Sequence, residues 1–593
     1  MAISAIKERL GRLMSWRNSQ DGDGLPPKEE QPLRAELYSV EQLERHAREL
    51  AASHTLATGR APDKLLSRLH QNEAILVHSY DLVTAAVKRK RRIAPAAEWL
   101  LDNFYLIEEQ IRTARRHLPR SYSRELPRLA SGPAANYPRV YGIALELISH
   151  VDGRVDGVSL DSFIDSYQTI TPLALGELWA VPIMLRLALI ENLRRVAARV
   201  AAGRRDGDLA DDWAERMVRV VEQNPTDLIL VMADMARANP PLSGAFLAEM
   251  TRHLQGQSPY FAFANSWLEN RLAEQGLTTT QLILAEGQGQ AADQVSIGNS
   301  INSLRFLSSN DWREFVENHS LVEQILQGDA SGVYADMDFA TRDRYRHAVE
   351  EIAKRSPGSE HEVATKAVQL AKESKWAGRA AGDKRQENEA TNHGPGLPNA
   401  RARPLAPDND RKTHVGYYLI DQGRAALERN AAMRMSPRIM AAKIGRRWPL
   451  FFYLVGVLLI TAGATAVFLG FSSWQPDSLG LALLAAPFLM CAAHLGIGIT
   501  QWLTITLVTP RQLPRLDFSE GIPPKHRTMV VVPTMLSSPE AVQNLLDDLE
   551  VRYLANRGDN LHFALLTDLD DAAQEVMPTD EELVRLAREG IEH

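Results

Sequence analysis

Cysteine is nearly absent from this 593-residue sequence, which contains only Cys491. An internal disulfide and a cysteine-rich metal site are therefore excluded, and the apolar run around Cys491 favours a small buried side chain there. An excess of positive charge is lacking too, because the net charge is -7 and the pI is about 6.2. These values give no support for nucleic acid as a partner.

The first residues also lack the pattern of a signal peptide. The first residues, MAISAIKERLGRLMSWRNSQ, are amphipathic and basic, but they contain no continuous apolar core of the kind that a signal peptide needs. We therefore expect residues 1–32 to form a poorly ordered basic N-terminus in the cytoplasm.

Charged residues are absent from two long apolar runs, residues 448–471 and 479–508, neither of which contains Asp, Glu, Lys or Arg. As helices they would extend about 36 Å and about 45 Å, against a hydrocarbon core of about 30 Å. The residues between them suffice only for a turn. Residues 448–508 are thus predicted to form a transmembrane hairpin, and the alternative is a buried hairpin of a soluble protein.

The charges around these runs predict the orientation of the hairpin. Basic residues lie before and after it, and the only charged residue between the two runs is Asp477. By the positive-inside rule, both ends then face the cytoplasm. The basic residues are Arg434, Arg438, Lys443, Arg446 and Arg447 on the first side and Arg511, Arg515, Lys525 and Arg527 on the second.

Helical signals run through residues 33–375, which we predict to be an irregular all-α cytoplasmic region. Ser39 suits an N-cap with Gln42 as its capping-box partner, and Pro95 suits the first turn of a helix over residues 95–118. No fixed repeat period is present. Four tryptophans are expected to anchor the core: Trp99, Trp179, Trp267 and Trp312.

Apolar residues become scarce in the next segment, where Pro, Gly, Asn and charged residues dominate. This composition predicts a flexible linker over residues 376–412. Residues 413–447 then form a basic juxtamembrane helical segment that leads into the first apolar run.

Residues 509–593 begin like an α/β domain. A strand from about Thr528 runs to Val532 and ends at Pro533-Thr534. Ser538 and Pro539 suit the cap and first turn of a helix. Gly558 would then end the helix in the left-handed conformation. The run LHFALLTD then predicts a second, parallel strand that ends at Asp568. Pro533, Thr534 and Asp568 should therefore lie together at the edge where open α/β sheets bind ligands.

The residues at this edge narrow the choice of ligand. The turn PTMLSSP contains no glycine, so a dinucleotide fold is disfavoured. The Asp568 carboxylate can instead accept a hydrogen bond from a base or ribose of a nucleoside diphosphate. Two alternatives remain: a solvated turn that contains Asp568, Asp570 and Asp571, or an aspartyl-phosphatase motif with Asp568 as nucleophile and Asp570 as acid.

Three long blocks, residues 96–157, 413–428 (THVGYYLIDQGRAALE) and 513–572, resemble the amino-terminal part of the cyclic β-1,2-glucan synthases. The resemblance covers nearly the whole chain. It implies a processive inner-membrane glucosyltransferase of the GT-A type, which uses UDP-glucose in the cytoplasm and grows the glucan on its own polypeptide. It also implies a divalent metal, Mg or Mn, for the complete enzyme, and as partners the growing glucan, the lipid bilayer and the rest of the synthase.

The resemblance assigns roles to residues of this chain one at a time. Pro533 and Thr534 match the first-strand end that lines the nucleotide, and Asp568 matches the carboxylate that faces uracil. Asp570 and Asp571 are weaker candidates for the same nucleotide-binding site. We do not identify Asp568-Leu569-Asp570 as the metal-binding D-x-D, because that motif follows a later strand. We therefore expect neither catalytic residues nor metal ligands of the transferase within the chain. Tyr553 is a candidate acceptor for self-glucosylation.

The predicted fold is mainly α: an all-α region, a transmembrane hairpin and the first βαβ unit of an incomplete GT-A-like domain. The enzymes that the chain resembles are several times longer, so we expect a fragment without glucosyl transfer of its own. The alternative function is a membrane-tethered all-α scaffold whose α/β end is vestigial.

Overall fold

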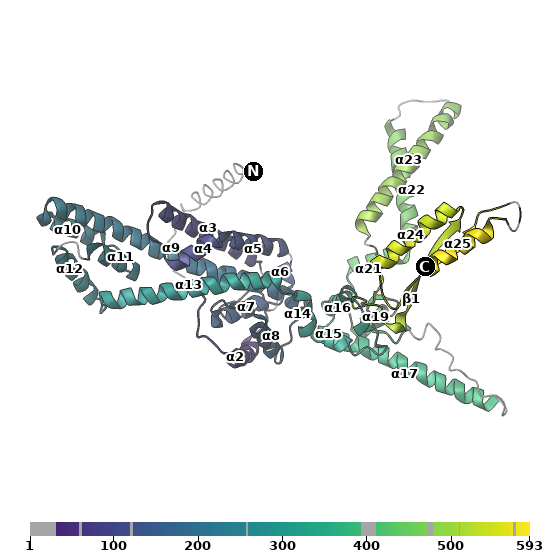
Figure 1. Ribbon diagram of the computed structural model, residues 1–593, viewed down its shortest axis with the longest axis horizontal. Helices are drawn as coiled ribbons and strands as arrows, with labels where there is room; N and C mark the ends of the chain where they lie inside the picture. Colours follow the sequence, from purple (N-terminus) through teal and green to yellow (C-terminus); the bar gives the residue numbers. More distant parts are fainter. Residues whose placement is uncertain are drawn as a thin grey trace. The chain divides into compact units, whose positions relative to one another are not determined.

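The computed structural model describes residues 31–57, 62–118, 122–255, 259–392, 411–471, 478–508, 510, 512–572, 574 and 577–593. The chain divides into two compact units, Met1–Glu323 and Gln324–His593 (Figure 1). The predicted N-terminal segment falls almost entirely outside the described residues. Helices dominate both units, and a two-stranded parallel sheet lies near the C-terminus, as predicted.

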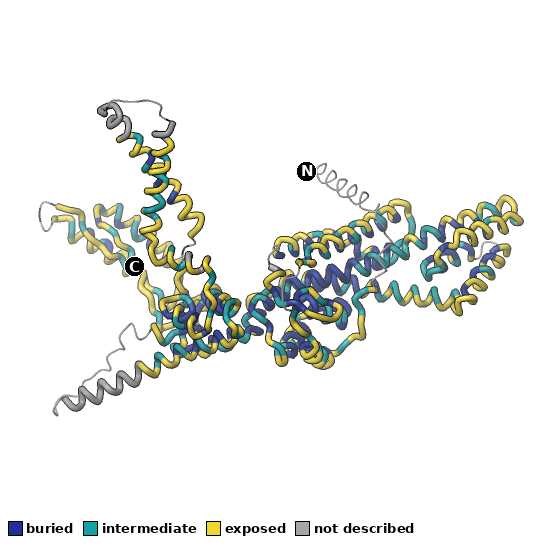
Figure 2. The backbone as a smooth tube through the Cα atoms, turned by 180° about the vertical axis from the view of Figure 1, so that it is seen from behind, coloured by how far each residue is buried: buried dark blue, intermediate teal, exposed yellow. Residues whose placement is uncertain are grey.

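One helix, α9 (Leu175–Gln223), organises the first unit. Its 49 residues extend about 74 Å at 1.5 Å per residue. From Leu178 to Ala197 it is apolar on nearly all sides and correspondingly buried, which Figure 2 shows as a dark band. In the second half of α9, Arg204 Nε donates to the Asp208 carboxylate one turn later, at 3.0 Å, which helps to stabilise this stretch.

Helices on either side of α9 build a large core around its first half. The predicted tryptophans Trp99, Trp179 and Trp312 pack partly buried against this core. The surrounding helices are α2 (Val40–Ser53), α3 (Leu65–Lys88), α4 (Pro95–Asp102), α5 (Phe104–His117), α6 (Tyr122–Glu125), α7 (Arg139–His150), α8 (Gly157–Gln168), α13 (Thr279–Ser309) and α14 (Trp312–His319).

A second, smaller core forms around the other half of α9 and contains four methionines as well as Trp213. The fourth predicted tryptophan, Trp267, packs against it. The helices that complete this core are α10 (Leu228–Ala238), α11 (Gly244–Leu254) and α12 (Phe261–Ala273).

Local signals in the sequence predicted helix starts better than helix ends. Ser39 and Gln42 form the predicted capping box, and Pro95 occupies the first turn of α4. The predicted helix over 95–118, however, is interrupted at Asn103, which separates α4 from α5. Its side-chain amide donates to the Trp99 carbonyl at 3.0 Å, and a residue that bonds its own backbone in this way competes with the regular helix.

The second unit begins with a helical platform. Asp329 is fully buried and accepts hydrogen bonds from His414 Nδ1, at 2.7 Å, and from the Val415 amide, at 2.9 Å. Burial alone raises its pKa, but the hydrogen bonds of His414 and Ser331 outweigh burial and hold that pKa below its usual range. The platform comprises α16 (Phe339–Ala353), α17 (Glu360–Asn392), α19 (Val415–Ile420) and α20 (Arg424–Asn430). The short helix α15 (Leu321–Leu326) spans the boundary between the two units.

Helix α17 corrects part of the linker prediction. It runs to Asn392, whereas we expected a flexible segment over 376–412. The segment from 376 to 392 is rich in Ala, Glu, Lys, Arg and Gln, which favour helix even where apolar residues are scarce. The rest of the predicted linker, from 393 to 410, lies outside the described residues.

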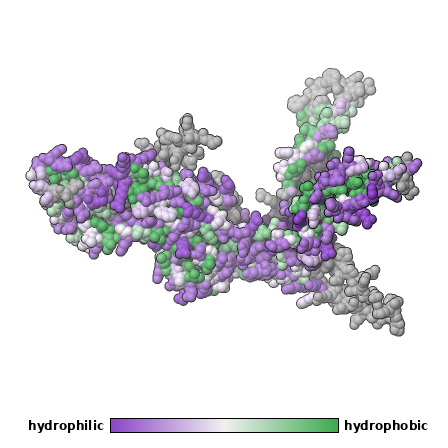
Figure 3. Space-filling view, in the orientation of Figure 1, coloured by the Kyte–Doolittle hydropathy of each residue, from purple (hydrophilic) through white to green (hydrophobic). Residues whose placement is uncertain are grey.

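Two long apolar helices, α22 (Pro449–Phe471) and α23 (Ser478–Leu507), follow the basic helix α21 (Pro437–Arg447) and pack against each other. Within them, Pro449–Val467 and Ala486–Leu507 are long and apolar enough to cross a membrane. Figure 3 shows apolar side chains gathered on this pair. The helices approach closely at Gly496, where an added Cβ would lie 2.9 Å from the Val457 carbonyl.

The segments before and after the helix pair meet. Met337 pairs with Leu516 in an antiparallel bridge, the Asp338 amide donates to the Arg515 carbonyl at 3.0 Å, and the Arg515 amide donates to Thr341 Oγ1 at 3.0 Å. Because the platform precedes α22 and Arg515 follows α23, both flanks of the pair lie on one side of it. This contact supports the predicted hairpin, and it does so independently of the basic residues on the two flanks.

The chain then forms β1 (Thr528–Leu536), α24 (Pro539–Ala555), β2 (Leu561–Leu569) and α25 (Asp580–Glu592). Ser538 caps α24 by accepting from the Ala541 amide at 3.2 Å, as predicted. The predicted left-handed exit at Gly558 is wrong, since Gly558 is not among the residues with positive φ. The helix ends instead at Asn556, whose side-chain amide donates to the Arg552 carbonyl at 2.9 Å.

Candidate sugar-nucleotide site

Strands β1 and β2 are parallel and in register, so that Thr534 pairs with Thr567 and Met535 with Asp568. The crossover between them is α24. The predicted βαβ unit is therefore present, and Pro533, Thr534 and Asp568 lie on neighbouring strands near their carboxyl ends, as expected from the sequence. Strand β1 continues to Leu536, four residues beyond the predicted end, so Pro533 and Thr534 lie within the strand.

The two faces of this sheet differ. Side chains alternate between faces along a strand, and Leu536 faces α24 and α25, where it packs with Val542 and Leu583 in a small buried cluster. The opposite face is apolar and open: Met535 is 51% exposed and Leu566 is 62% exposed. Parallel sheets usually have both faces covered. The apolar open face of this sheet therefore resembles the buried face of a complete parallel sheet.

The strand pairing separates the predicted site residues. Pro533 and Asp568 share the open face, because Asp568 pairs with Met535 in the register and Met535 is two residues from Pro533. Thr534 is half-buried and points to the helix face. Asp570 and Asp571 follow the end of β2 and are exposed. The structure thus brings together Pro533 and Asp568 on one face, with two further carboxylates at its rim.

The Asp568 carboxylate has one oxygen in a local hydrogen bond. Its Oδ1 accepts from the Leu569 amide at 2.9 Å, and the residue is exposed. Among the described residues, no hydrogen bond to the second oxygen, Oδ2, is present. A carboxylate oxygen of this kind can accept the imino or hydroxyl hydrogen of a nucleoside.

The divalent metal implied by the family resemblance does not fit these carboxylates. Among the described residues, Asp568, Asp570 and Asp571 do not form a group whose ligand atoms lie within 4.8 Å of one another. No step of a reaction is therefore derived from a metal at this edge.

Tyr553 is not brought together with these residues. It lies near the end of α24, is 48% exposed, and packs edge-to-face on Phe563 with ring centroids 6.2 Å apart. Phe563 precedes Asp568 by five residues on β2, which corresponds to about 16 Å along a strand. The assignment of Tyr553 as acceptor stays a prediction that this arrangement does not favour.

A group of potential metal ligands elsewhere in the chain carries no signal in the sequence. His46, Glu146 and His150 come together in the first unit, although His46 is 100 residues from Glu146. Only Glu146 and His150, at helical i, i+4 spacing on α7, could have been paired from the sequence.

Comparison with known proteins supports the family resemblance. No protein-family profile matches the chain. The chain is 30% identical over 564 residues to the cyclic beta-(1,2)-glucan synthase NdvB of Rhizobium meliloti (strain 1021), a match that covers 94% of this chain and 19% of that protein. The chain thus spans about a fifth of the length of the curated relative. The resemblance found in the sequence is confirmed: along nearly its whole length, the chain is related to the cyclic β-1,2-glucan synthases.

Proposed function

We propose that the chain is part of a processive membrane glucosyltransferase, which uses UDP-glucose to build cyclic β-1,2-glucan on a protein-bound intermediate. The observation that carries this proposal is the similarity over 94% of the chain to a cyclic β-(1,2)-glucan synthase. Since the chain spans 19% of that relative, we assign it a share of the donor site and the membrane anchor, and not the complete activity.

The sheet edge supports the assignment of a donor site. Asp568 and Pro533 lie on the open face of neighbouring parallel strands, at the edge where sheets of this kind bind ligands. In this proposal the Asp568 carboxylate accepts the imino hydrogen of uracil, and the apolar side chain of Pro533 lies against the base. Asp570 and Asp571 are near enough along the chain to accept from the ribose hydroxyls.

The helix pair supports a membrane location. Two apolar helices are long enough to cross a membrane, and the segments that flank them are in contact. In this proposal the sheet and the platform therefore lie on the same side of the bilayer. The basic flanks indicate that this is the cytoplasmic side of the bacterial inner membrane, where UDP-glucose is available. A divalent metal, Mg or Mn, then belongs to the part of the transferase domain that carries its D-x-D motif.

The test uses membranes that contain the protein at its natural length, incubated with labelled UDP-glucose, with label that migrates with the polypeptide as the readout. Asp568→Asn should lower labelling at limiting UDP-glucose about tenfold or more, because a hydrogen bond to a charged group contributes about 1.5–3 kcal/mol. The matched control is Asp559→Asn, an exposed aspartate before β2 and so at the opposite edge of the sheet.

The proposal has two separable parts. Absence of labelled polypeptide and of β-1,2-glucan with the unmodified protein would contradict the glucosyltransferase assignment. Equal labelling by the Asp568→Asn and Asp559→Asn proteins would contradict the assignment of Asp568 while leaving the reaction intact.

A further inference from the structure

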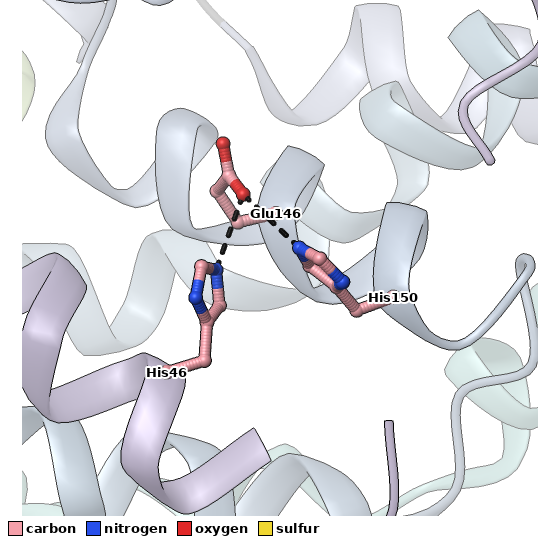
Figure 4. A group of neighbouring side chains, drawn as sticks. All are labelled: His46, Glu146 and His150. Atoms are coloured by element: carbon pink, nitrogen blue, oxygen red, sulfur yellow. Dashed lines mark hydrogen bonds and ion pairs between the residues drawn. The ribbon is translucent and has the colours of Figure 1, made fainter. Parts of the chain in front are cut away.

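Two histidines and a glutamate, carried by α2 and α7, converge in the first unit. His46 is on α2, and Glu146 and His150 are one turn apart on α7. The Nε2 atom of His46 lies 3.3 Å from Glu146 Oε2, and the Nε2 atom of His150 lies 3.7 Å from the same oxygen. Figure 4 shows the three side chains directed toward one another, and one ligand atom from each lies within 4.8 Å of the others.

These distances match those of a metal coordination shell. With zinc bonds of about 2.0–2.2 Å to imidazole nitrogen and carboxylate oxygen, two ligand atoms of a tetrahedral site are about 3.3–3.5 Å apart. The observed separations of 3.3 Å and 3.7 Å lie within a few tenths of an ångström of that range. Side-chain adjustments of this size leave the backbone of α2 and α7 in place.

The orientation of His150 suits a metal ligand. Its Nδ1 lies 2.8 Å from the Glu36 carbonyl oxygen, which can only accept, so Nδ1 carries a hydrogen. The other ring nitrogen, Nε2, faces the Glu146 carboxylate. A histidine held in this way through its second nitrogen is the usual form of a metal ligand.

The surroundings hold the ligands and admit an ion. The Tyr38 ring stacks on the His150 ring, with centroids 4.0 Å apart and planes 7° apart. Among the described residues, the ion pairs of Glu146 are those with the two histidines. Glu146 is 35% exposed, which gives access to water. Both α7 ligands lie near the carboxyl end of that helix, where the helix dipole favours positive charge.

We propose that His46 Nε2, the Glu146 carboxylate and His150 Nε2 bind a divalent transition metal, with Zn²⁺ as the ion that this ligand set suits. Two imidazoles and one carboxylate with an open fourth position, filled by water, form a known type of zinc site. The ion fastens α2 to the end of α7. This site is independent of the proposed glucosyltransferase function and lies in a different unit from the sheet edge.

A second group in the same unit, Asp211, Glu249 and His253, satisfies the same distance criterion but is a poor cation site. Arg204 donates to Asp211 Oδ2 at 3.1 Å, and Arg252 donates to Glu249. Guanidinium groups therefore already occupy the carboxylates and repel a metal ion. This group provides the matched control, because removal of His253 deletes a histidine from a similar cluster.

The experiment uses the tag-free chain purified in detergent, stripped with a chelator and titrated with Zn²⁺, with bound zinc measured by elemental mass spectrometry after gel filtration. The unmodified chain should retain about one equivalent of zinc. His46→Ala and Glu146→Gln should weaken binding by more than about tenfold, whereas His253→Ala should bind like the unmodified chain. Cobalt in place of zinc should give visible absorption bands of a four-coordinate site, and these should be lost in Glu146→Gln.

Folding of each variant is checked by far-ultraviolet circular dichroism in the metal-free state, so that lost binding is not confused with an unfolded chain. Glu146→Gln preserves size and shape and should fold like the unmodified chain. Zinc binding that is equal in the unmodified, His46→Ala and Glu146→Gln proteins would overturn the proposal, and so would the absence of bound zinc from the unmodified chain. Loss of binding in His253→Ala alone would place the ion at the second group.

Discussion

Replacement of Glu191 by Gln should destabilise the first unit more than any surface substitution on the same helix. The side chain of Glu191 is 2% exposed on α9. It accepts from Arg68 at 2.9 Å and 2.6 Å, from Arg194 at 2.7 Å and from Arg195 at 2.8 Å. Burial alone raises the pKa of this carboxyl, but the three arginines outweigh burial and lower the pKa to about 2.

The magnitude follows from this pKa. A shift from 4.5 to about 2 corresponds to about 3 kcal/mol of stabilisation by the ionised form. Because the pKa is lowered in the folded state, this contribution is complete above pH 4.5 and is lost as the pH falls toward 2. Glu191→Gln also leaves three guanidinium groups without their carboxylate, so we expect a loss of about 3–5 kcal/mol at neutral pH.

The assay is hydrogen exchange of the α3 and α9 amides in increasing urea, followed by mass spectrometry, since a chain of two units need not unfold in one step. The matched control is Glu215→Gln, an exposed carboxyl on the same helix. The difference between Glu191→Gln and the unmodified chain should narrow below about pH 4.5. Equal stability of the two glutamine variants at neutral pH would refute the reasoning.

Three further predictions concern the second unit. Ser538→Ala should cost about 1 kcal/mol through loss of the helix cap, seen as faster amide exchange in the first turn of α24, and unchanged exchange there would contradict it. A hydrogen bond that His347 donates to Asp343 raises the pKa of His347 to about 9, so the stabilisation by the charged histidine is complete below pH 6.5 and is lost as the pH rises through 9. Because His347 is about half exposed, the difference between the unmodified chain and His347→Gln in urea unfolding should be about 1 kcal/mol near pH 6, and an undiminished difference above pH 9 would contradict this reasoning. Gly496→Val should separate α22 from α23, since a Cβ there would lie 2.9 Å from the Val457 carbonyl, and the overpacking should lower stability by about 1–3 kcal/mol. Thermal unfolding in detergent measures this loss, and an unchanged midpoint would argue against the observed packing.

Features written in short stretches of sequence were predictable. The capped helix after Ser538 and the two apolar runs on either side of it identified the βαβ unit, because each of these signals is local and the crossover rule fixes how the strands pair. The absence of charge from two long runs identified the apolar helix pair. At the sheet edge, the proximity of Pro533 to Asp568 followed from parallel pairing alone.

Features that depend on contacts between distant residues were not predictable. The stretch of α9 past Ala202 is stabilised partly by Arg91 in the loop between α3 and α4, whose guanidinium lies 3.6 Å from Asp211. The separation of Thr534 from Asp568 onto opposite faces required the strand register. The bridge between Met337 and Leu516 joins a residue before α22 to a residue after α23. No hydrophobic pattern in the sequence predicts such a contact.

The most direct test of the central claim, that the chain places a sugar-nucleotide site on the cytoplasmic side of a membrane, compares sealed vesicles of opposite orientation. Membranes that contain the protein at its natural length are prepared inside-out and right-side-out and are supplied with labelled UDP-glucose, which does not cross the bilayer. The account predicts labelled polypeptide and β-1,2-glucan with inside-out vesicles, where the basic flanks and the sheet are exposed. Labelling confined to right-side-out vesicles would contradict it.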